Sequence, residues 1–161
     1  ASDVYKRQDQ FPVEQFIGRA LVIHCPELRE GERVPFSAVE RVRPLADQAE
    51  FLLFHTGWGR YWGTERYFGD YPCIDQGIVD YLLQSGKKGV GLDTIGVDPI
   101  ADAYLSIHRR LFQDHDLVVM ENLANLDQIG DGLFTLFALP LRYQDADGSP
   151  IRAVAVLDGE E

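Results

Sequence analysis

The stretch LSIHRRLFQDHDLVVMENLANL, residues 105–126, shows how helix and strand alternate in this chain. A helix is predicted to begin near Asp102, and one stripe of it carries Tyr104, Leu105, His108, Leu111 and Phe112. That stripe is predicted to face the core, with the histidine in its middle. The apolar residues 117–120 predict a short buried strand, which ends on Glu121 and Asn122. The question is what a carboxylate at the end of a buried strand does beside a histidine.

The rest of the chain alternates between strands and helices in the same way. Strands are predicted at 19–25, 49–58, 88–94, 117–121, 133–139 and 151–156. Helices are predicted at 36–45, with Ser37 as the N-cap and Pro44 at the end, and at 74–86. Residues 59–72 hold too many glycines and tyrosines for a regular element, so we predict a long loop there. This order of elements predicts an α/β or α+β fold, a mixed β-sheet with packed helices.

Length and composition fit one folded domain, with 161 residues of which 45% are apolar. The net charge of −11 argues against nucleic acid and anionic membrane surfaces as partners, because like charges repel. No apolar run is long enough to span a bilayer. Cys25 and Cys73 lack the spacing of metal or redox sites, so the reducing cytoplasm is the expected compartment.

His108 and Glu121 each have a structural and a functional interpretation. From spacing alone, His108 is best explained as a core histidine satisfied by one hydrogen bond. Glu121 stands at a strand end, where α/β sheets gather ligands, and could bind a metal or act as a base. It could also only fill the strand end while Asn122 caps the next helical turn. Together the two residues are a stronger candidate, because a buried histidine and a carboxylate satisfy each other.

Other histidines and aromatic residues have mainly structural interpretations. His55, in the stretch HTGW at 55–58, is predicted to be structural, and His24 and His115 are predicted to have no chemical role. Trp58 and Tyr61 could wall an apolar pocket or only cover the edge of the sheet. The sequence has no nucleophile elbow, no phosphate loop and no cysteine pairs of the kind that bind zinc.

Five stretches together resemble the cyclase family of metal-dependent hydrolases, of the kynurenine formamidase and isatin hydrolase type. They occur in family order over residues 11–156 and read FLLFHTGWGRYWGTERYFGDYPCI, GVGLDTIGVDP, HRRLFQDHDLVVMENLANLD, FTLFALPLR and GSPIRAVAVL. The most specific pairing is HTGW with the later histidine and ENL. The resemblance implies a swivelling β/β/α-like fold and assembly as a homo-oligomer, a dimer or a tetramer.

The resemblance also implies a site and a reaction. His108 would be a catalytic acid–base group and a metal ligand, Glu121 a second metal ligand, and Trp58 and Tyr61 substrate-binding residues. The implied cofactor is a divalent metal ion, zinc or alternatively manganese. The implied reaction is hydrolysis of an amide bond in a small cyclic or aromatic substrate. An example is conversion of N-formylkynurenine to kynurenine and formate in tryptophan breakdown.

The chain departs from the family pattern in two places. The interval from His108 to Glu121 is slightly longer than usual, and the family's metal motif H-x-G-T-H-x-D-x-P-x-H is absent from the sequence. In addition, DVYKRQ at 3–8 resembles the translation of a transposase end sequence used in sequencing libraries, and the alternative is a natural polar N-terminal tail. We therefore expect residues 1–10 to be non-native or disordered.

Residues 11–158 are then expected to be the C-terminal portion of a cyclase-like hydrolase domain that is truncated at its N-terminus. Such a fragment would have weak or no activity of its own. The alternative is a non-catalytic binding or interaction module derived from the same fold.

Overall fold

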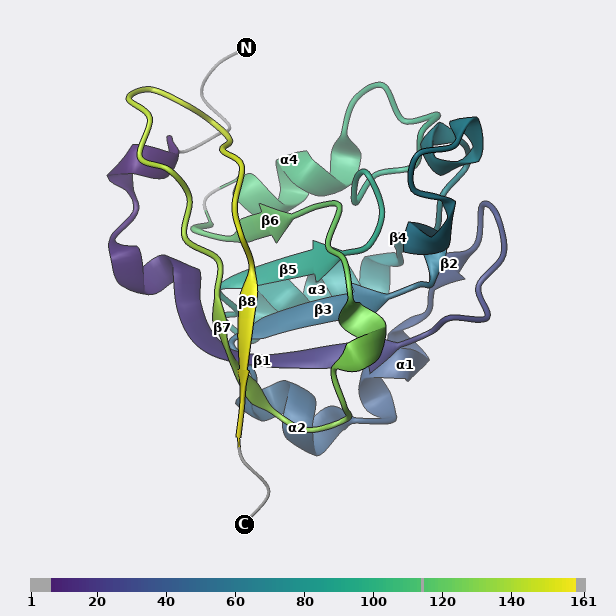
Figure 1. Ribbon diagram of the computed structural model, residues 1–161, viewed down its shortest axis with the longest axis horizontal. Helices are drawn as coiled ribbons and strands as arrows, with labels where there is room; N and C mark the ends of the chain where they lie inside the picture. Colours follow the sequence, from purple (N-terminus) through teal and green to yellow (C-terminus); the bar gives the residue numbers. More distant parts are fainter. Residues whose placement is uncertain (1–6, 114, 159–161) are drawn as a thin grey trace.

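The computed structural model describes residues 7–113 and 115–158, which form a mixed sheet with helices packed on it (Figure 1). The main sheet has the strand order β6-β5-β3-β1-β7-β8. Its strands are β1 Ile17–His24, β3 Phe51–His55, β5 Gly89–Leu92, β6 Val118–Met120, β7 Phe134–Phe137 and β8 Val154–Leu157. A separate short pair consists of β2 Arg33–Val34 and β4 Cys73–Ile74. The predicted mixed α/β sheet with packed helices is confirmed.

The direction of the strands decides where a site can form. β1, β3, β5 and β6 run parallel, so their carboxyl ends lie along one edge of the sheet. β7 pairs with β1 and β8 pairs with β7, both antiparallel. In Figure 1 this β7–β8 hairpin crosses in front of the other strands, and α3 lies behind them.

The described helices are α1 Phe36–Glu40, α2 Arg43–Gln48, α3 Gln76–Gln84 and α4 Ser106–Phe112. They bury their apolar residues against one face of the sheet, in a core that includes Leu21, Ile23, Leu52, Phe54, Val39, Ile78, Leu82 and Leu111. The other face has a second core beneath the 3-10 turn η5 Leu126–Gln128, with Val22, Leu53, Met120, Leu126, Phe134 and Leu136. Near-continuous apolar strands are expected when a sheet is covered on both faces.

The predicted single helix over 36–45 is wrong, because the segment forms two short helices. The N-cap of α1 is Pro35, and Ser37 lies inside the helix. Pro44 lies in the first turn of α2 and does not end a helix. A proline is tolerated there because the first amide groups of a helix have no intrahelical partner.

The helix around His108 starts later than predicted. Leu105 has a φ of 51°, in the left-handed region, and α4 begins at Ser106. Tyr104 and Leu105 are therefore outside the helix and exposed, whereas Leu111 is fully buried, as predicted. Left-handed backbone at a non-glycine residue is uncommon.

The long loop predicted at 59–72 contains two 3-10 turns, η3 Trp58–Tyr61 and η4 Glu65–Phe68. Tyr67 and Tyr71 fill a small core of their own with Trp58 and Cys73. The expectation of disorder over residues 1–10 falls partly on residues 1–6, which lie outside the described residues. Gln8–Gln10 form the 3-10 turn η1, and the prediction that residues 1–10 are non-native or disordered stays a prediction.

None of the helices in residues 7–113 and 115–158 has the length and apolar content needed to cross a bilayer.

Candidate active site

The parallel strands deliver polar side chains to one edge of the sheet. β1 ends at His24 and β3 ends at His55, while Asp93 directly follows β5 and Glu121 directly follows β6. Because these strands share one direction, all four residues stand along the carboxyl edge, where α/β sheets commonly bind ligands. The sequence prediction that Glu121 stands at a strand end is confirmed.

Asp98 fixes both the start of α4 and the ring of His108. Its Oδ1 accepts a hydrogen bond from the amide of Ile107 at 2.6 Å, and its Oδ2 accepts one from the amide of His108 at 3.1 Å. The same Oδ2 lies 2.5 Å from Nδ1 of the His108 ring. Asp98 is only 2% exposed. A carboxylate shielded from water in this way depends on its protein donors.

Glu121 lies on the other side of the His108 ring. Its Oε1 is 3.2 Å from Nε2 of the histidine, and the His108 side chain is 16% exposed. Burial by itself lowers the pKa of His108, but the hydrogen bonds to Asp98 and Glu121 outweigh burial and raise the pKa to about 9. At neutral pH the ring is therefore an imidazolium held between two carboxylates.

The contacts decide between the interpretations that spacing left open. His108 is not a core histidine with one hydrogen bond, because both ring nitrogens face carboxylates. Asn122 does not cap a helical turn: its Oδ1 accepts a hydrogen bond from the hydroxyl of Tyr67 at 2.8 Å, and Asn125 is the residue that precedes η5. The structure brings His108 and Glu121 together, while their catalytic and metal-binding roles stay predictions.

Trp58 and Tyr61, the aromatic residues predicted to bind substrate, do not form an open wall of a binding pocket. Trp58 is 1% exposed, and its Nε1 donates a hydrogen bond to the carbonyl of Tyr67. Tyr61 lies edge-on to Trp58, with ring centroids 4.8 Å apart, and the guanidinium of Arg66 lies 4.2 Å from its ring centroid. The aromatic residue that this loop exposes most is Trp62, at 67%. A substrate-binding role for Trp58 and Tyr61 stays a prediction.

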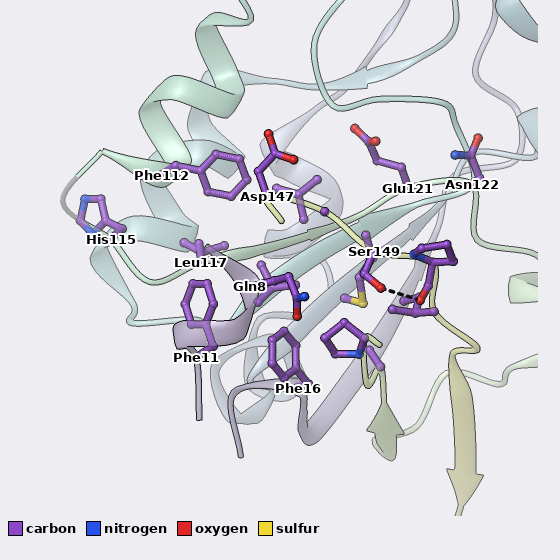
Figure 2. A pocket seen from close by; sticks show the side chains of 18 residues that line it. Gln8, Phe11, Phe16, Phe112, His115, Leu117, Glu121, Asn122, Asp147 and Ser149 are labelled. Carbon is purple, nitrogen blue, oxygen red and sulfur yellow. Dashed lines mark hydrogen bonds between the residues drawn. The ribbon is translucent and has the colours of Figure 1, made fainter. Parts of the chain in front are cut away.

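A cavity of about 460 Å³ opens beside Glu121. Figure 2 shows Glu121 and Asn122 at one end of it, with Phe11, Phe16 and Phe112 further along. Small-molecule pockets commonly have volumes of roughly 300–1,000 Å³ and mainly apolar walls with a few polar groups. The cavity has the size and the aromatic walls for a small, flat molecule whose polar end faces Glu121.

The donor chemistry of His108 and Glu121 matches a metal site, but their number does not complete one. The bond from Nδ1 to Asp98 leaves Nε2 as the ligating atom when the ring is neutral, as is common for metal-binding histidines. Within residues 7–113 and 115–158, no group of three or more His, Cys, Asp or Glu side chains could hold a metal ion. Zinc sites in proteins normally use three or four protein ligands, so these two donors alone fall short of one.

Asp98 is the candidate site residue that the sequence analysis missed. It lies in the stretch GVGLDTIGVDP, ten residues before His108, and carried no predicted role. Its side chain reaches α4 because the chain turns back through Leu105 with a positive φ. No pattern of spacing indicates such a turn, although Asp followed by Pro does favour a chain reversal.

Comparison with known proteins gives both a family and a fold. The Cyclase family model matches residues 2–99. A kynurenine formamidase of Bacillus thuringiensis (strain Al Hakam) is 34% identical over 155 residues, which cover 92% of this chain and 67% of the relative. The chain spans about two thirds of the length of the curated relatives it matches.

Two solved structures share the fold. An isatin hydrolase bound to the product analogue thioisatinate superposes with a TM-score of 0.83 at 23% identity, over 99% of this chain and 66% of that chain. A potential metal-dependent hydrolase with cyclase activity gives a TM-score of 0.69 at 19% identity, over 93% of this chain and 70% of that chain.

Proposed function

The chain belongs to the Cyclase family, and from that premise we propose that it is part of a metal-dependent hydrolase that cleaves an amide bond in a small cyclic or aromatic molecule. The observation that carries the proposal is the His108 ring held between Asp98 and Glu121 beside an aromatic-walled cavity. The proposed substrate is N-formylkynurenine, converted to kynurenine and formate. Relatives named kynurenine formamidase support this choice.

The side chains of this chain can carry the proton transfers of amide hydrolysis. Water adds to the carbonyl carbon, the C–N bond breaks, and the leaving nitrogen must gain a proton. Glu121 can accept a proton from the attacking water, and the His108 imidazolium can donate one from Nε2 to the leaving nitrogen. Asp98 holds the ring in place for this transfer through Nδ1.

A divalent ion is the proposed cofactor, zinc or alternatively manganese. His108 and Glu121 would hold it together with further ligands, and it would polarise the carbonyl and lower the pKa of a bound water. The name of one structural neighbour, a metal-dependent hydrolase, supports this proposal. Nε2 of His108 cannot bind an ion and carry a proton at once. Metal binding and proton donation are therefore alternative roles for this atom.

Ion binding is the decisive test. We expect calorimetry with Zn²⁺ or Mn²⁺ to show weak binding at one site per chain, because only two donors converge. His108→Ala and Glu121→Ala should each abolish it. The exposed His115 is the matched control, since this imidazole lies at the other end of the cavity from Glu121 (Figure 2). Release of kynurenine from N-formylkynurenine should be slow or absent with this chain and lost fully in His108→Ala.

A chain that binds neither ion and releases no kynurenine would contradict the proposal. It would favour the second candidate, a non-catalytic binding module. One observation supports that candidate, namely that the described residues offer a cavity of about 460 Å³ and only two metal donors.

We also propose that the protein is a homo-oligomer in the cytoplasm. The outer strand β8 exposes Val154, Val156 and Leu157, which a second copy could cover. Cys25 and Cys73 are both buried free thiols, as is usual in a reducing compartment. Light scattering on the purified protein should give a dimer or tetramer mass, and a monomer mass at all concentrations would contradict the assembly.

A further inference from the structure

A second pair of histidines lies on the carboxyl edge of the sheet. His24 ends β1 and His55 ends β3, and the two residues occupy the same register position on neighbouring parallel strands. Their rings meet edge to face with centroids 5.2 Å apart, and the two Nδ1 atoms are 3.0 Å apart. Nε2 of His24 lies 2.9 Å from the carbonyl oxygen of Ile129.

These contacts determine where the protons are. The carbonyl of Ile129 can only accept, so Nε2 of His24 must carry a hydrogen. A neutral His24 then has a bare Nδ1, which can accept a hydrogen bond from Nδ1–H of His55. His55 is therefore fixed in the tautomer that leaves its Nε2 bare, because a neutral imidazole carries one hydrogen.

The bare Nε2 of His55 has no hydrogen-bond partner among the described residues, and His55 lines a cavity of about 600 Å³. Neither His108 nor Glu121 is among the residues that line this cavity. Its charged residues are Arg60, Asp93 and Asp127, and Tyr67 and Trp62 supply aromatic walls. One guanidinium and two carboxylates make the cavity net negative, which disfavours an anion.

We propose that this cavity is a second binding site for a small molecule that donates an N–H group, an amide or an amine, to Nε2 of His55. His24 is a positioning residue for this site, because it sets the tautomer of His55 and does not itself line the cavity. Asp93 is held in place by the amide and hydroxyl of Thr56 through its Oδ1, at 3.0 and 2.6 Å. The proposal does not depend on the reaction at His108 and Glu121.

The first test measures the tautomer directly. Nitrogen-15 NMR of the imidazole rings at about pH 8, above the usual histidine pKa of about 6.5, should show a protonated Nδ1 and a bare Nε2 for His55. His24→Leu should convert His55 to the tautomer mixture of an unconstrained ring. His24→Gln should retain the wild-type tautomer, because the amide oxygen can accept from His55 while the amide nitrogen donates to Ile129. Nε2–H on His55 in the wild-type chain would overturn the proposal.

The second test uses benzamide, benzylamine and benzoate as probes. Benzamide or benzylamine should shift the His55 ring signals in a saturable way, whereas benzoate should not. The saturable shift should remain in His108→Ala, which separates this site from the proposed hydrolase site. Calorimetric binding of the same probe, measured on the wild type and on His55→Phe, should be lost in His55→Phe. Two other results would overturn the proposal: no saturable shift with either donor, or a shift of both Nδ1 atoms by Zn²⁺ alone, which would mark the pair as a metal site.

Discussion

His108 and His55 lie along the same edge of the sheet, but their neighbours give them opposite properties. Both nitrogens of His108 face carboxylates, so its ring holds a proton up to a pKa of about 9. His55 faces another imidazole through its Nδ1 and lines a cavity. The difference shows that two histidines on one sheet edge can have very different surroundings, and that the partners of the ring set which of its nitrogens can donate a hydrogen bond.

Removing Asp98 should produce the largest effect, because this buried carboxylate joins the α4 amides to the His108 ring. Asp98→Ala should lower the free energy of unfolding by about 3–5 kcal/mol, the usual cost of breaking a buried charge pair. Urea unfolding followed by circular dichroism measures the loss. Asp98→Asn should cost less, because one amide oxygen can still accept from Ile107.

Asp102 is the matched control for Asp98. It also accepts hydrogen bonds from backbone amides near the start of α4, those of Tyr104 and Ser106, but it is more exposed to water. Asp102→Ala should therefore cause a much smaller loss of stability. If Asp98→Ala and Asp102→Ala lower the free energy of unfolding equally, the contact between Asp98 and the His108 ring adds nothing to the stability that helix capping gives.

The pH dependence of stability tests the raised pKa of His108. The pKa of His108 is raised by folding from 6.5 to about 9, so its contribution is fully present below pH 6.5. It is lost as the pH rises through 9, and the loss should be up to about 3 kcal/mol at about 1.4 kcal/mol per pKa unit. Urea unfolding in EDTA at several pH values measures it.

His108→Gln is the reference for that measurement, since it removes the titrating group and keeps a hydrogen-bonding side chain. The variant should lose the part of the pH dependence that lies between 6.5 and 9. A wild-type profile that matches the His108→Gln profile would mean that His108 is not held as an imidazolium.

Sequence alone could predict the pair at His108 and Glu121, but not the other polar contacts. The helical stripe put His108 on a buried face, and the strand end put Glu121 at the carboxyl edge. Their complementary chemistry and the family resemblance joined the two residues. The contact between His24 and His55 depends on the register of β1 against β3, which no local pattern specifies. The contact between Asp98 and His108 likewise depends on the turn at Leu105, which no local pattern specifies.

The fold was predictable for a different reason. Alternation of apolar strands and amphipathic helices indicates a mixed sheet even when boundaries are wrong, because each element must bury its apolar face. The errors occurred where two signals conflict. Pro44 is a helix breaker in most positions, yet it is favourable in the first turn of α2. The aromatic residues of 59–72 indicate an apolar environment, but composition does not say that Trp58 is buried and Trp62 exposed.

Removing the charge of Glu121 should have an intermediate effect. Glu121→Gln should lower the pKa of His108 by about one unit, because one of its two carboxylate neighbours is lost and Asp98 remains. Proton NMR titration of the His108 ring measures the shift. Asp127→Asn, on the wall of the other cavity, should leave the pKa of His108 unchanged. If both variants shift the pKa of His108 equally, the shift comes from the change in the net charge of the protein and not from the contact between Glu121 and His108.

Breaking the His24–His55 pair should have the smallest effect on stability. His24→Leu removes the hydrogen bonds to His55 and to Ile129, and half-buried neutral contacts of this kind are worth about 1 kcal/mol in total after exchange with water. Urea unfolding of His24→Leu and His24→Gln measures the loss, and the Gln variant should recover most of it. A loss as large as that in Asp98→Ala would mean that the pair mainly holds β1 to η5. A small loss of stability together with a changed His55 tautomer would mean that the pair contributes little to the fold. Its main effect would then be to leave Nε2 of His55 free to bind a ligand.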